Sequence, residues 1–489
     1  MKDADRAEGE QVPERGIGLS RRSLLKAMLA GAAAPALSKT GWGRAAARNP
    51  LYFPPTIYGG NVSLTCAPAQ ANLGGGHISN VLAYNGTFPA PTLAVRKGQF
   101  VNVVLHNGLA QETITHWHGM IVDEQNDGGP HMAIPPNGSH SYSYPVVNRA
   151  GLNFYHPHPH RLTGEQVCLG LAGALIVRDA EEDALGLPGS LYSGAPPLSV
   201  PRARATPFSS KYEVPLILRD ANFDGSGNLR YNPGGNGFFG DTPLVNGTIE
   251  ATLSVDASVY RFRVLNGSNA RVMRLALSNG SMFRLIGNDG GLLEFGSQVG
   301  TFVIGPGERL DVLVDFRGYA VGTSVMLRDL DANWDLIEFL VTSSHAEGNI
   351  PSGRLSTIER LANPVRTRTF EFEGMNKVNG RSFDMNRIDF QVPFGEVERW
   401  ILTTRGTAPH PVHIHGASFQ VRSRTGGRGQ VFPWETGWKD TVLLLDAETV
   451  EVLIRFDRQA YYSGPQRYVI HCHKLEHEDA GMMSNFVVN

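Results

Sequence analysis

Ten of the sixteen histidines in this 489-residue chain lie in four short clusters, two near each end of the folded region. The clusters are His116-Trp-His118-Gly, His156-Pro-His158, His410-Pro-Val-His413-Ile-His415-Gly and His471-Cys472-His473-Lys-Leu-Glu-His477. Random placement does not produce such grouping, and imidazole is the commonest metal ligand in proteins. If the clusters serve one metal assembly, the fold must bring the two ends of the chain together.

The spacing within the clusters predicts several metal ions. Residues i and i+2 of a strand share one face, so each His-x-His pair points two imidazoles the same way, about 6.6 Å apart. The four pairs (116/118, 156/158, 413/415 and 471/473) supply eight imidazoles. A single copper or zinc ion takes only about four ligands. Eight convergent histidines therefore indicate more than one ion.

Cys472 lies between two of these histidines and must point to the opposite face of a strand. It can join a second site with the remaining cluster members His410 and His477 and with Met482. A cysteine thiolate with two histidines and a weak axial methionine describes a blue-copper electron-transfer site. Copper is therefore the favoured metal.

The rest of the chain is typical of an all-β protein. Short runs with a period near two, such as Phe100–Leu105, Tyr260–Val264 and Val450–Phe456, are separated by turns in a sequence with 56 Gly and 30 Pro. This pattern favours β-sandwich modules, and 489 residues suggest about three domains. The formal net charge of −2 gives no basic surface for nucleic acid.

Two stretches rich in turn-forming and polar residues, Ala180–Thr206 and Ser343–Val365, are predicted linkers. They divide the chain into modules at 49–180, 207–342 and 366–489. The histidine clusters fall only in the first and third modules, so we expect the middle one to act as a spacer.

The N-terminus is predicted to be an export signal over residues 1–48. Twin arginines at Arg21 and Arg22 precede an apolar run, Ala27–Leu37, that is too short to span a membrane. We expect cleavage near Ala47, transfer by the Tat translocase, a periplasmic location and no membrane span in the mature chain.

Besides Cys472, the chain has Cys66 and Cys168. These two either form a disulfide in an oxidising compartment or remain separate buried thiols.

The four clusters resemble the motifs of the multicopper oxidase family, in particular its bacterial three-domain laccases and copper-efflux oxidases. The likeness spans the mature chain and implies three cupredoxin-like Greek-key sandwiches with four copper ions. It implies a type 1 copper on His410, Cys472 and His477 with Met482 axial, and a type 2 copper on His116 and His413. It also implies a type 3 pair on the remaining histidines: His118, His156, His158, His415, His471 and His473.

The resemblance further implies one-electron oxidation of a donor coupled to four-electron reduction of dioxygen to water. Asp127 and Glu478 match acidic positions of the family, and a positioned carboxylate suits proton delivery. The alternatives are a turn role for Asp127 and an orienting hydrogen bond from Glu478. His160, although two residues after His158, is expected to lie outside the ligand set.

The donor is predicted from what the chain lacks. Copper-efflux oxidases carry a methionine-rich insert and an acidic residue before the third motif. Here Thr403–Pro409 contains neither an acidic residue nor a methionine, and the only methionines in Val365–Arg399 are Met375 and Met385. We expect an open type 1 edge that accepts phenols or aromatic amines. The alternatives are a cuprous-ion oxidase, a copper-free cell-envelope scaffold and a copper-sequestering protein.

Overall fold

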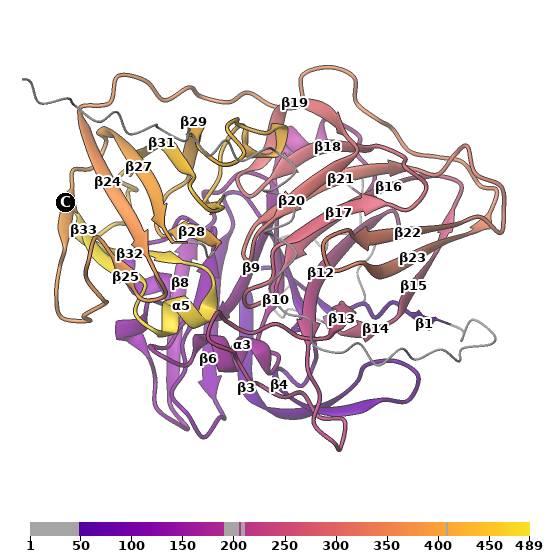
Figure 1. Ribbon diagram of the computed structural model, residues 1–489, viewed down its shortest axis with the longest axis horizontal. Helices are drawn as coiled ribbons and strands as arrows, with labels where there is room; N and C mark the ends of the chain where they lie inside the picture. Colours follow the sequence, from indigo (N-terminus) through magenta and orange to yellow (C-terminus); the bar gives the residue numbers. More distant parts are fainter. Residues whose placement is uncertain (1–47, 190–204, 207–210, 407–408) are drawn as a thin grey trace, which may run out of the picture. The chain divides into compact units, whose positions relative to one another are not determined.

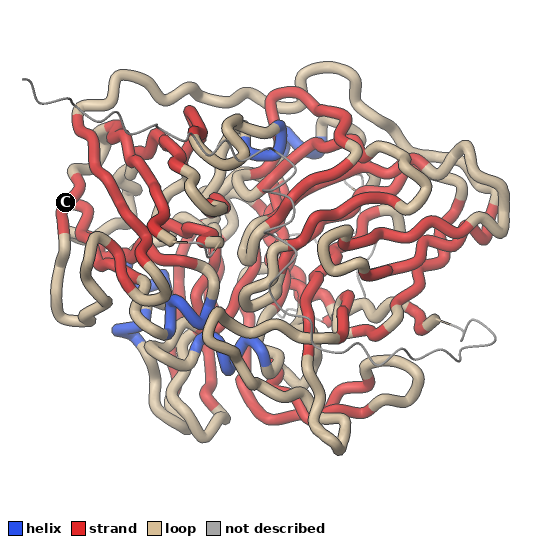
Figure 2. Tube along the Cα trace, in the orientation of Figure 1, coloured by secondary structure: helices blue, strands red, loops and turns tan. Residues whose placement is uncertain are grey.

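The computed structural model describes residues 48–189, 205–206, 211–406 and 409–489, so the predicted twin-arginine segment lies outside the described residues. Arg48–Asn489 form one compact unit. Its described part contains six β-sheets and a few short helices (Figure 2), which confirms the predicted all-β fold. The helices are α2 (Glu124–Asp127), α3 (Thr163–Cys168), α4 (Ala180–Asp183) and α5 (Leu475–Asp479), with 3-10 turns at Pro130–Met132 and Pro433–Glu435.

The first sandwich packs the sheet β4-β3-β6-β8 against the sheet β11-β2-β5-β10-β9-β7. Alternate residues of β6 are buried, as the period of two predicts. The core between the sheets holds Trp117 and Tyr155, both fully buried. The strands are β2 (Thr56–Tyr58), β3 (Asn61–Asn72), β4 (Ile78–Tyr84), β5 (Thr92–Arg96), β6 (Phe100–Asn107), β7 (Thr115–His118), β8 (Ser139–Pro145), β9 (Gly151–Pro157), β10 (Gly173–Arg178) and β11 (Ala205–Thr206).

The second sandwich consists of the sheets β1-β15-β23-β22-β17-β20 and β14-β13-β12-β16-β21-β18-β19 around a large apolar core (Figure 1). Its strands are β1 (Asn49–Pro50), β12 (Glu213–Ala221), β13 (Thr242–Val245), β14 (Thr248–Ile249), β15 (Ala251–Asp256), β16 (Val259–Asn266), β17 (Met273–Leu277), β18 (Phe283–Asn288), β19 (Gly291–Val299), β20 (Thr301–Ile304), β21 (Arg309–Asp315), β22 (Ser324–Asp329) and β23 (Trp334–Ser343).

The third sandwich pairs the sheet β25-β24-β27-β31-β29 with the sheet β26-β33-β32-β28-β30. Its core includes Trp400 and Phe486 and also Cys472 and Met482. Its strands are β24 (Arg366–Glu373), β25 (Lys377–Val378), β26 (Phe390–Val392), β27 (Val397–Arg405), β28 (His410–Ile414), β29 (Phe419–Thr425), β30 (Thr441–Leu444), β31 (Thr449–Arg455), β32 (Gln466–Cys472) and β33 (Met483–Val488).

Two segments differ from the sequence-based expectation. β1, at the start of the predicted first module, pairs in parallel with β15 of the second sandwich. The predicted linker begins with α4, whose Glu182 is fully buried between Arg261 and Arg263 of the second sandwich. Both are long-range contacts, which local composition does not report.

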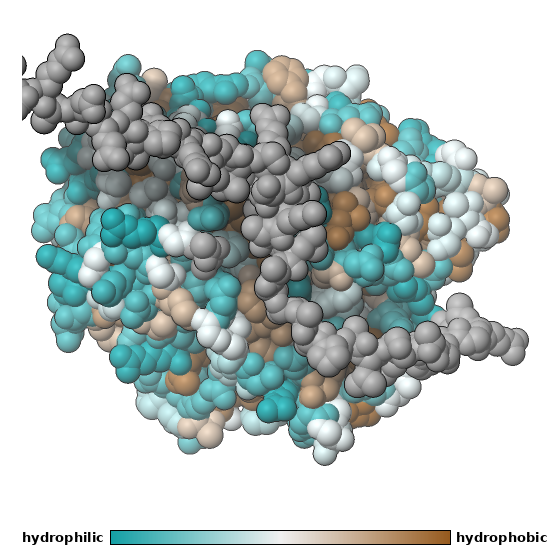
Figure 3. Space-filling model, viewed as in Figure 1, coloured by the Kyte–Doolittle hydropathy of each residue, from teal (hydrophilic) through white to brown (hydrophobic). Residues whose placement is uncertain are grey.

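The first and third sandwiches meet where α3 contacts α5. The carboxylate of Asp479 accepts hydrogen bonds from the backbone N–H groups of Thr163 and Gly164, at 3.0 and 2.8 Å. No helix among the described residues is long and apolar enough to cross a membrane. On the face shown in Figure 3, hydrophilic residues predominate among the coloured atoms and apolar residues are interspersed between them.

Candidate metal centre

Strand pairing brings the histidine clusters together. In the first sandwich His116 of β7 lies opposite His156 of β9, and in the third His413 of β28 lies opposite His471 of β32. Each His-x-His pair thus has a neighbour across the ladder, where side chains on one face lie close together. The two groups then meet across the boundary of the sandwiches, where the Nε2 atoms of His116 and His413 are 3.4 Å apart.

Two further sets of three imidazoles each converge on a point. In each set the potential ligand atoms lie within 4.8 Å of one another, and every ring is buried. The first set is His118, His156 and His473; the second is His158, His415 and His471. With the pair His116 and His413, these sets account for eight histidines from both ends of the chain.

Hydrogen bonds hold the outward-pointing nitrogen of three of these rings, His116, His413 and His415. The Nδ1 atom of His116 donates to the backbone carbonyl of Asp127 at 2.7 Å, and that of His415 lies 2.8 Å from the Asp127 carboxylate. The Nδ1 atom of His413 donates to the carbonyl of Asp440 at 2.9 Å. Such outer contacts set the tautomer and the direction of a metal-binding ring.

Four other ring nitrogens of the cluster, in contrast, have no protein partner. His118 Nδ1, His156 Nε2 and both ring nitrogens of His473 are buried without a hydrogen bond. Unpaired buried polar atoms are costly, by about 1–3 kcal/mol each. Burial, followed by neighbouring imidazoles, lowers the pKa of His156 to about 3 and that of His473 well below its usual range. Neutral rings with free nitrogens are the donors that copper and zinc require, so the residues fit a metal cluster.

Cys472 lies in a separate group on the other face of β32. Its Sγ atom is 3.5 Å from His410 Nδ1 and 3.8 Å from His477 Nδ1. Its backbone N–H donates to the carbonyl of Met482 at 3.1 Å, and both side chains belong to the same buried core. Burial raises the pKa of the Cys472 thiol to about 12. A bound cation or strong hydrogen-bond donors would be needed to offset this increase and give a thiolate.

The predicted open edge at this thiol site is wrong. His410 and His477 are both 0 % exposed. The loop of the second sandwich that contains Gly237 passes beside Lys474, so close that a Cβ atom at Gly237 would lie 2.9 Å from Lys474 Cε. Access of a donor to the thiol site therefore depends on this loop of the second sandwich as well as on the size of the third sandwich.

The two predicted carboxylates both lie against the imidazole cluster, but in different electrostatic states. Glu478 is 3.1 Å from His471 Nδ1 and 3.4 Å from His158 Nδ1. Burial acts to raise its pKa, yet these two rings outweigh burial and hold the pKa at about 2. Burial, then Glu124 and Asp123, raise the pKa of Asp127 well above its usual range.

A third carboxylate was not predicted. Asp440 Oδ1 lies 3.1 Å from His118 Nε2, and the backbone carbonyl of the same residue holds His413. No motif marks Lys-Asp-Thr at 439–441, so the role of Asp440 depends on a contact that only the folded chain forms.

The remaining cysteines, Cys66 and Cys168, are buried free thiols. His160 contacts Phe383 and belongs to no ligand group among the described residues.

Family models described as "Multicopper oxidase" match residues 65–182 and 354–489. The "Laccase" of Bacillus subtilis (strain 168) is 31% identical, over 82% of this chain and 88% of its own length. The chain belongs to the multicopper oxidase family. Among solved structures, McoA multicopper oxidase from Aquifex aeolicus superposes with a TM-score of 0.82 at 34% identity, over 91% of this chain and 100% of its own. "Cell division protein FtsP" of Escherichia coli (strain K12) is 29% identical over 97% of this chain and 99% of its own length.

The two matched regions contain all ten clustered histidines, which lie in the first and third sandwiches. The His and Cys groups of this multicopper oxidase are consistent with the family's copper sites.

Proposed function

We propose that this multicopper oxidase is laccase-like: it couples one-electron oxidation of phenols or aromatic amines to four-electron reduction of dioxygen to water. The observation that carries the proposal is the pairing of a buried thiol group with a separate imidazole cluster, linked through consecutive residues. His471, Cys472 and His473 alternate between the two groups.

The proposed ligand assignment follows the groups. The type 1 copper would be held by His410, Cys472 and His477, with Met482 as the axial ligand. The type 2 copper would be held by His116 and His413. The type 3 pair would be held by two sets of three: His118, His156 and His473, and His158, His415 and His471. Bound copper would supply single-electron transfer at the first site and four-electron dioxygen chemistry at the cluster.

The chain's own residues have three roles in this proposal. The backbone of Cys472 gives a covalent path of one residue from the thiol site to the imidazole cluster. Asp127, whose pKa burial raises well above its usual range and whose Oδ1 atom has no hydrogen-bond partner, is the proposed proton donor for water formation. Glu478 stays ionised and is better suited to orient His158 and His471 than to release a proton.

The phenolic donor class is supported by the absence of acid and methionine in Thr403–Pro409. Since His410 and His477 are buried, electrons would leave the donor by outer-sphere transfer across covering atoms. A cuprous ion would need soft ligands at the entry point, which this segment does not provide.

The test is copper content and visible spectrum, followed by dioxygen uptake with a phenol and separately with cuprous ion. About four coppers, an intense blue band and uptake on the phenol alone are expected. Uptake mainly on cuprous ion would replace the proposal by a copper-tolerance oxidase. Copper without turnover on either donor would indicate a sequestering protein.

The similarity to "Cell division protein FtsP" of Escherichia coli (strain K12) favours one further candidate, a role in cell division in place of catalysis, for which we consider a copper-free cell-envelope scaffold. The buried, unpaired nitrogens of the imidazole cluster argue against it, because a scaffold has no use for them. Absence of copper and of the blue band after copper loading would favour the scaffold.

Export is part of the proposal. Arg21 and Arg22 support transfer by the Tat translocase to the periplasm. Replacing both by lysine should leave the protein in the cytoplasmic fraction with its leader attached. Unchanged export would exclude the Tat route.

A further inference from the structure

The second sandwich contains none of the proposed copper ligands, yet it places a charged side chain against the imidazole cluster. Arg309 is the first residue of β21 and is fully buried. Its Nη1 and Nη2 atoms donate to the two carboxylate oxygens of Asp440, at 2.7 and 2.5 Å. Its Nε atom donates to the carbonyl of Leu152 in β9, at 2.9 Å. One guanidinium therefore joins all three sandwiches.

Asp440, the acceptor, holds rings from two of the proposed copper sites. Its Oδ1 atom contacts His118 Nε2 at 3.1 Å, and its backbone carbonyl accepts from His413 Nδ1 at 2.9 Å. The hydroxyl of Thr441 donates to the same Oδ1 atom at 2.9 Å. A rotation of this carboxylate would therefore change the contact that directs His118, and a backbone shift would move His413.

The guanidinium sets the direction of that carboxylate. Two parallel N–H···O bonds from a rigid planar fork define the carboxylate plane, which a single lysine ammonium does not do. Removing one partner of a buried pair leaves the other charge uncompensated and strongly destabilised. Asp440 without Arg309 would therefore be expected to turn or move from its place beside His118.

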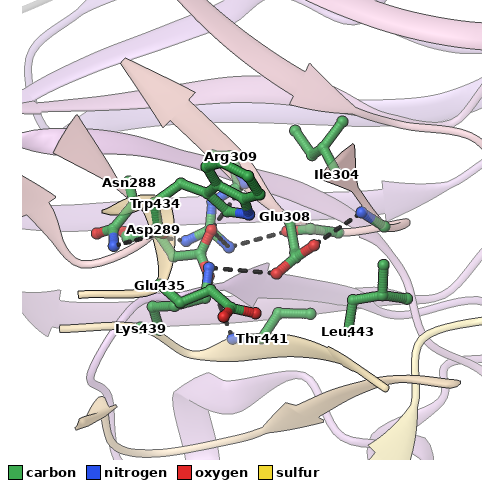
Figure 4. A network of polar contacts seen from close by, with 12 residues as sticks. Asn288, Asp289, Ile304, Glu308, Arg309, Trp434, Glu435, Lys439, Thr441 and Leu443 are labelled. Atoms are coloured by element: carbon green, nitrogen blue, oxygen red, sulfur yellow. Dashed lines mark hydrogen bonds and ion pairs between the residues drawn. The ribbon is translucent and has the colours of Figure 1, made fainter. Parts of the chain in front are cut away.

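Arg309 is itself held in place. Its backbone N–H donates to the Asp289 carboxylate at 2.7 Å, and the same carboxylate forms an ion pair with the Lys439 ammonium at 2.8 Å. Glu308 lies 3.3 Å from the same ammonium, and Figure 4 shows these side chains together in one buried network. The network thus runs from the second sandwich into the third, directly beside Asp440.

Gly119 packs directly against the pair. A Cβ atom at Gly119 would lie 2.6 Å from Arg309 Nη2 and 2.7 Å from Asp440 Oδ2. Gly119 also has φ +88°, a conformation that L side chains rarely adopt. The residue that follows His118 must therefore be small for the pair to form.

We propose that Arg309 is a positioning residue for the type 2 and adjacent type 3 copper sites, acting through Asp440. The second sandwich then completes the copper cluster, in place of the spacer role expected from the sequence. This inference rests on the copper assignment proposed above.

The test compares Arg309→Met with Arg424→Met. Arg424 is an equally buried arginine that pairs with Glu435 and Glu448 and touches no proposed ligand. In copper-loaded protein we expect Arg309→Met to keep the blue band, to change the type 2 electron paramagnetic resonance signal and to lose cluster copper to a chelator about 10- to 100-fold faster. Arg424→Met should keep the type 2 signal and the wild-type rate of copper loss.

Three further substitutions test the proposal if Arg309→Met does not fold. Arg309→Lys keeps the charge but not the fork, and Gly119→Ala crowds the pair without removing a charge. Both should alter the type 2 signal, and Asp440→Asn should add little to the defect of Arg309→Lys because the two residues act together.

An unchanged type 2 signal and rate of copper loss in the folded arginine variants would overturn the proposal. So would an equal loss in Arg424→Met. If the wild-type protein takes up no copper, the proposed function has failed; if it loads normally and the Arg309 variants match it, only the positioning role has failed.

Discussion

The metal-free chain should take up protons when it unfolds in mild acid. Burial is the largest influence that lowers the pKa of four proposed ligands to about 4, 3, 4 and 2: His158, His156, His410 and His477, respectively. In the unfolded chain each would return to about 6.5. These rings are therefore neutral at pH 5.5 when folded and about 90% protonated when unfolded, an uptake of about 3.6 protons.

The sign follows from linkage. A histidine whose pKa is depressed by folding contributes stability that is complete above pH 6.5 and is lost as pH falls towards the folded-state pKa. Between pH 7.5 and 5.5 the loss is about 1.4 kcal/mol for each such ring, or about 5.5 kcal/mol for the four. Four carboxyls whose pKa values burial raises act in the opposite sense and retain at most about four protons: Asp127, Glu308, Asp329 and Asp479. Five other cluster histidines add to the uptake: His116, His118, His413, His415 and His473.

The assay is potentiometric: apo-protein at pH 5.5 in weak buffer is unfolded with urea, and the acid needed to restore the pH is measured. We expect at least about two protons per chain. His410→Gln should lower the uptake by about 0.9 proton, because this ring is neutral when folded and about 90% protonated when unfolded. An uptake below one proton, or an unchanged uptake in His410→Gln, would refute the argument that the ligand rings are held neutral by burial.

Three further predictions concern single side chains. Cys472→Ser should lose the blue band and one of the four coppers but keep the cluster copper, because Cys472 belongs only to the thiol group. Copper analysis and the visible spectrum measure this, and a retained blue band would contradict it. Asp127→Asn should keep its copper and reduce dioxygen about 100-fold more slowly in single-turnover measurements. Glu478→Gln should mainly weaken copper retention. Unchanged dioxygen reduction in copper-loaded Asp127→Asn would exclude the role of Asp127 as proton donor. Trp117→Ala should lower the free energy of unfolding by about 3–5 kcal/mol, measured by denaturant titration, because this ring is fully buried; a change below 1 kcal/mol would show that the core closes around the gap.

Local periodicity accounts for the two features that the sequence predicts correctly, the all-β fold and the separation of Cys472 from the histidines beside it. A period of two places His471 and His473 on one face and Cys472 on the other, and in the structure they belong to different ligand groups. The same rule and the density of turn residues predict the all-β fold. Short-range geometry of this kind depends only on neighbouring residues, so it can be deduced from the amino-acid sequence.

Tertiary structure alone decided which distant residues touch. Asp440 and Arg309 are 131 residues apart, and neither stands in a recognisable pattern, yet they form the pair beside His118. The burial of His410 and the pairing of β1 with the second sandwich likewise depend on how sheets from different modules pack. The sequence by itself was enough to predict a copper-binding set of side chains, because such a prediction depends on residue type and spacing. The supporting contacts and the access to the thiol site were decided by long-range packing, which no local pattern encodes.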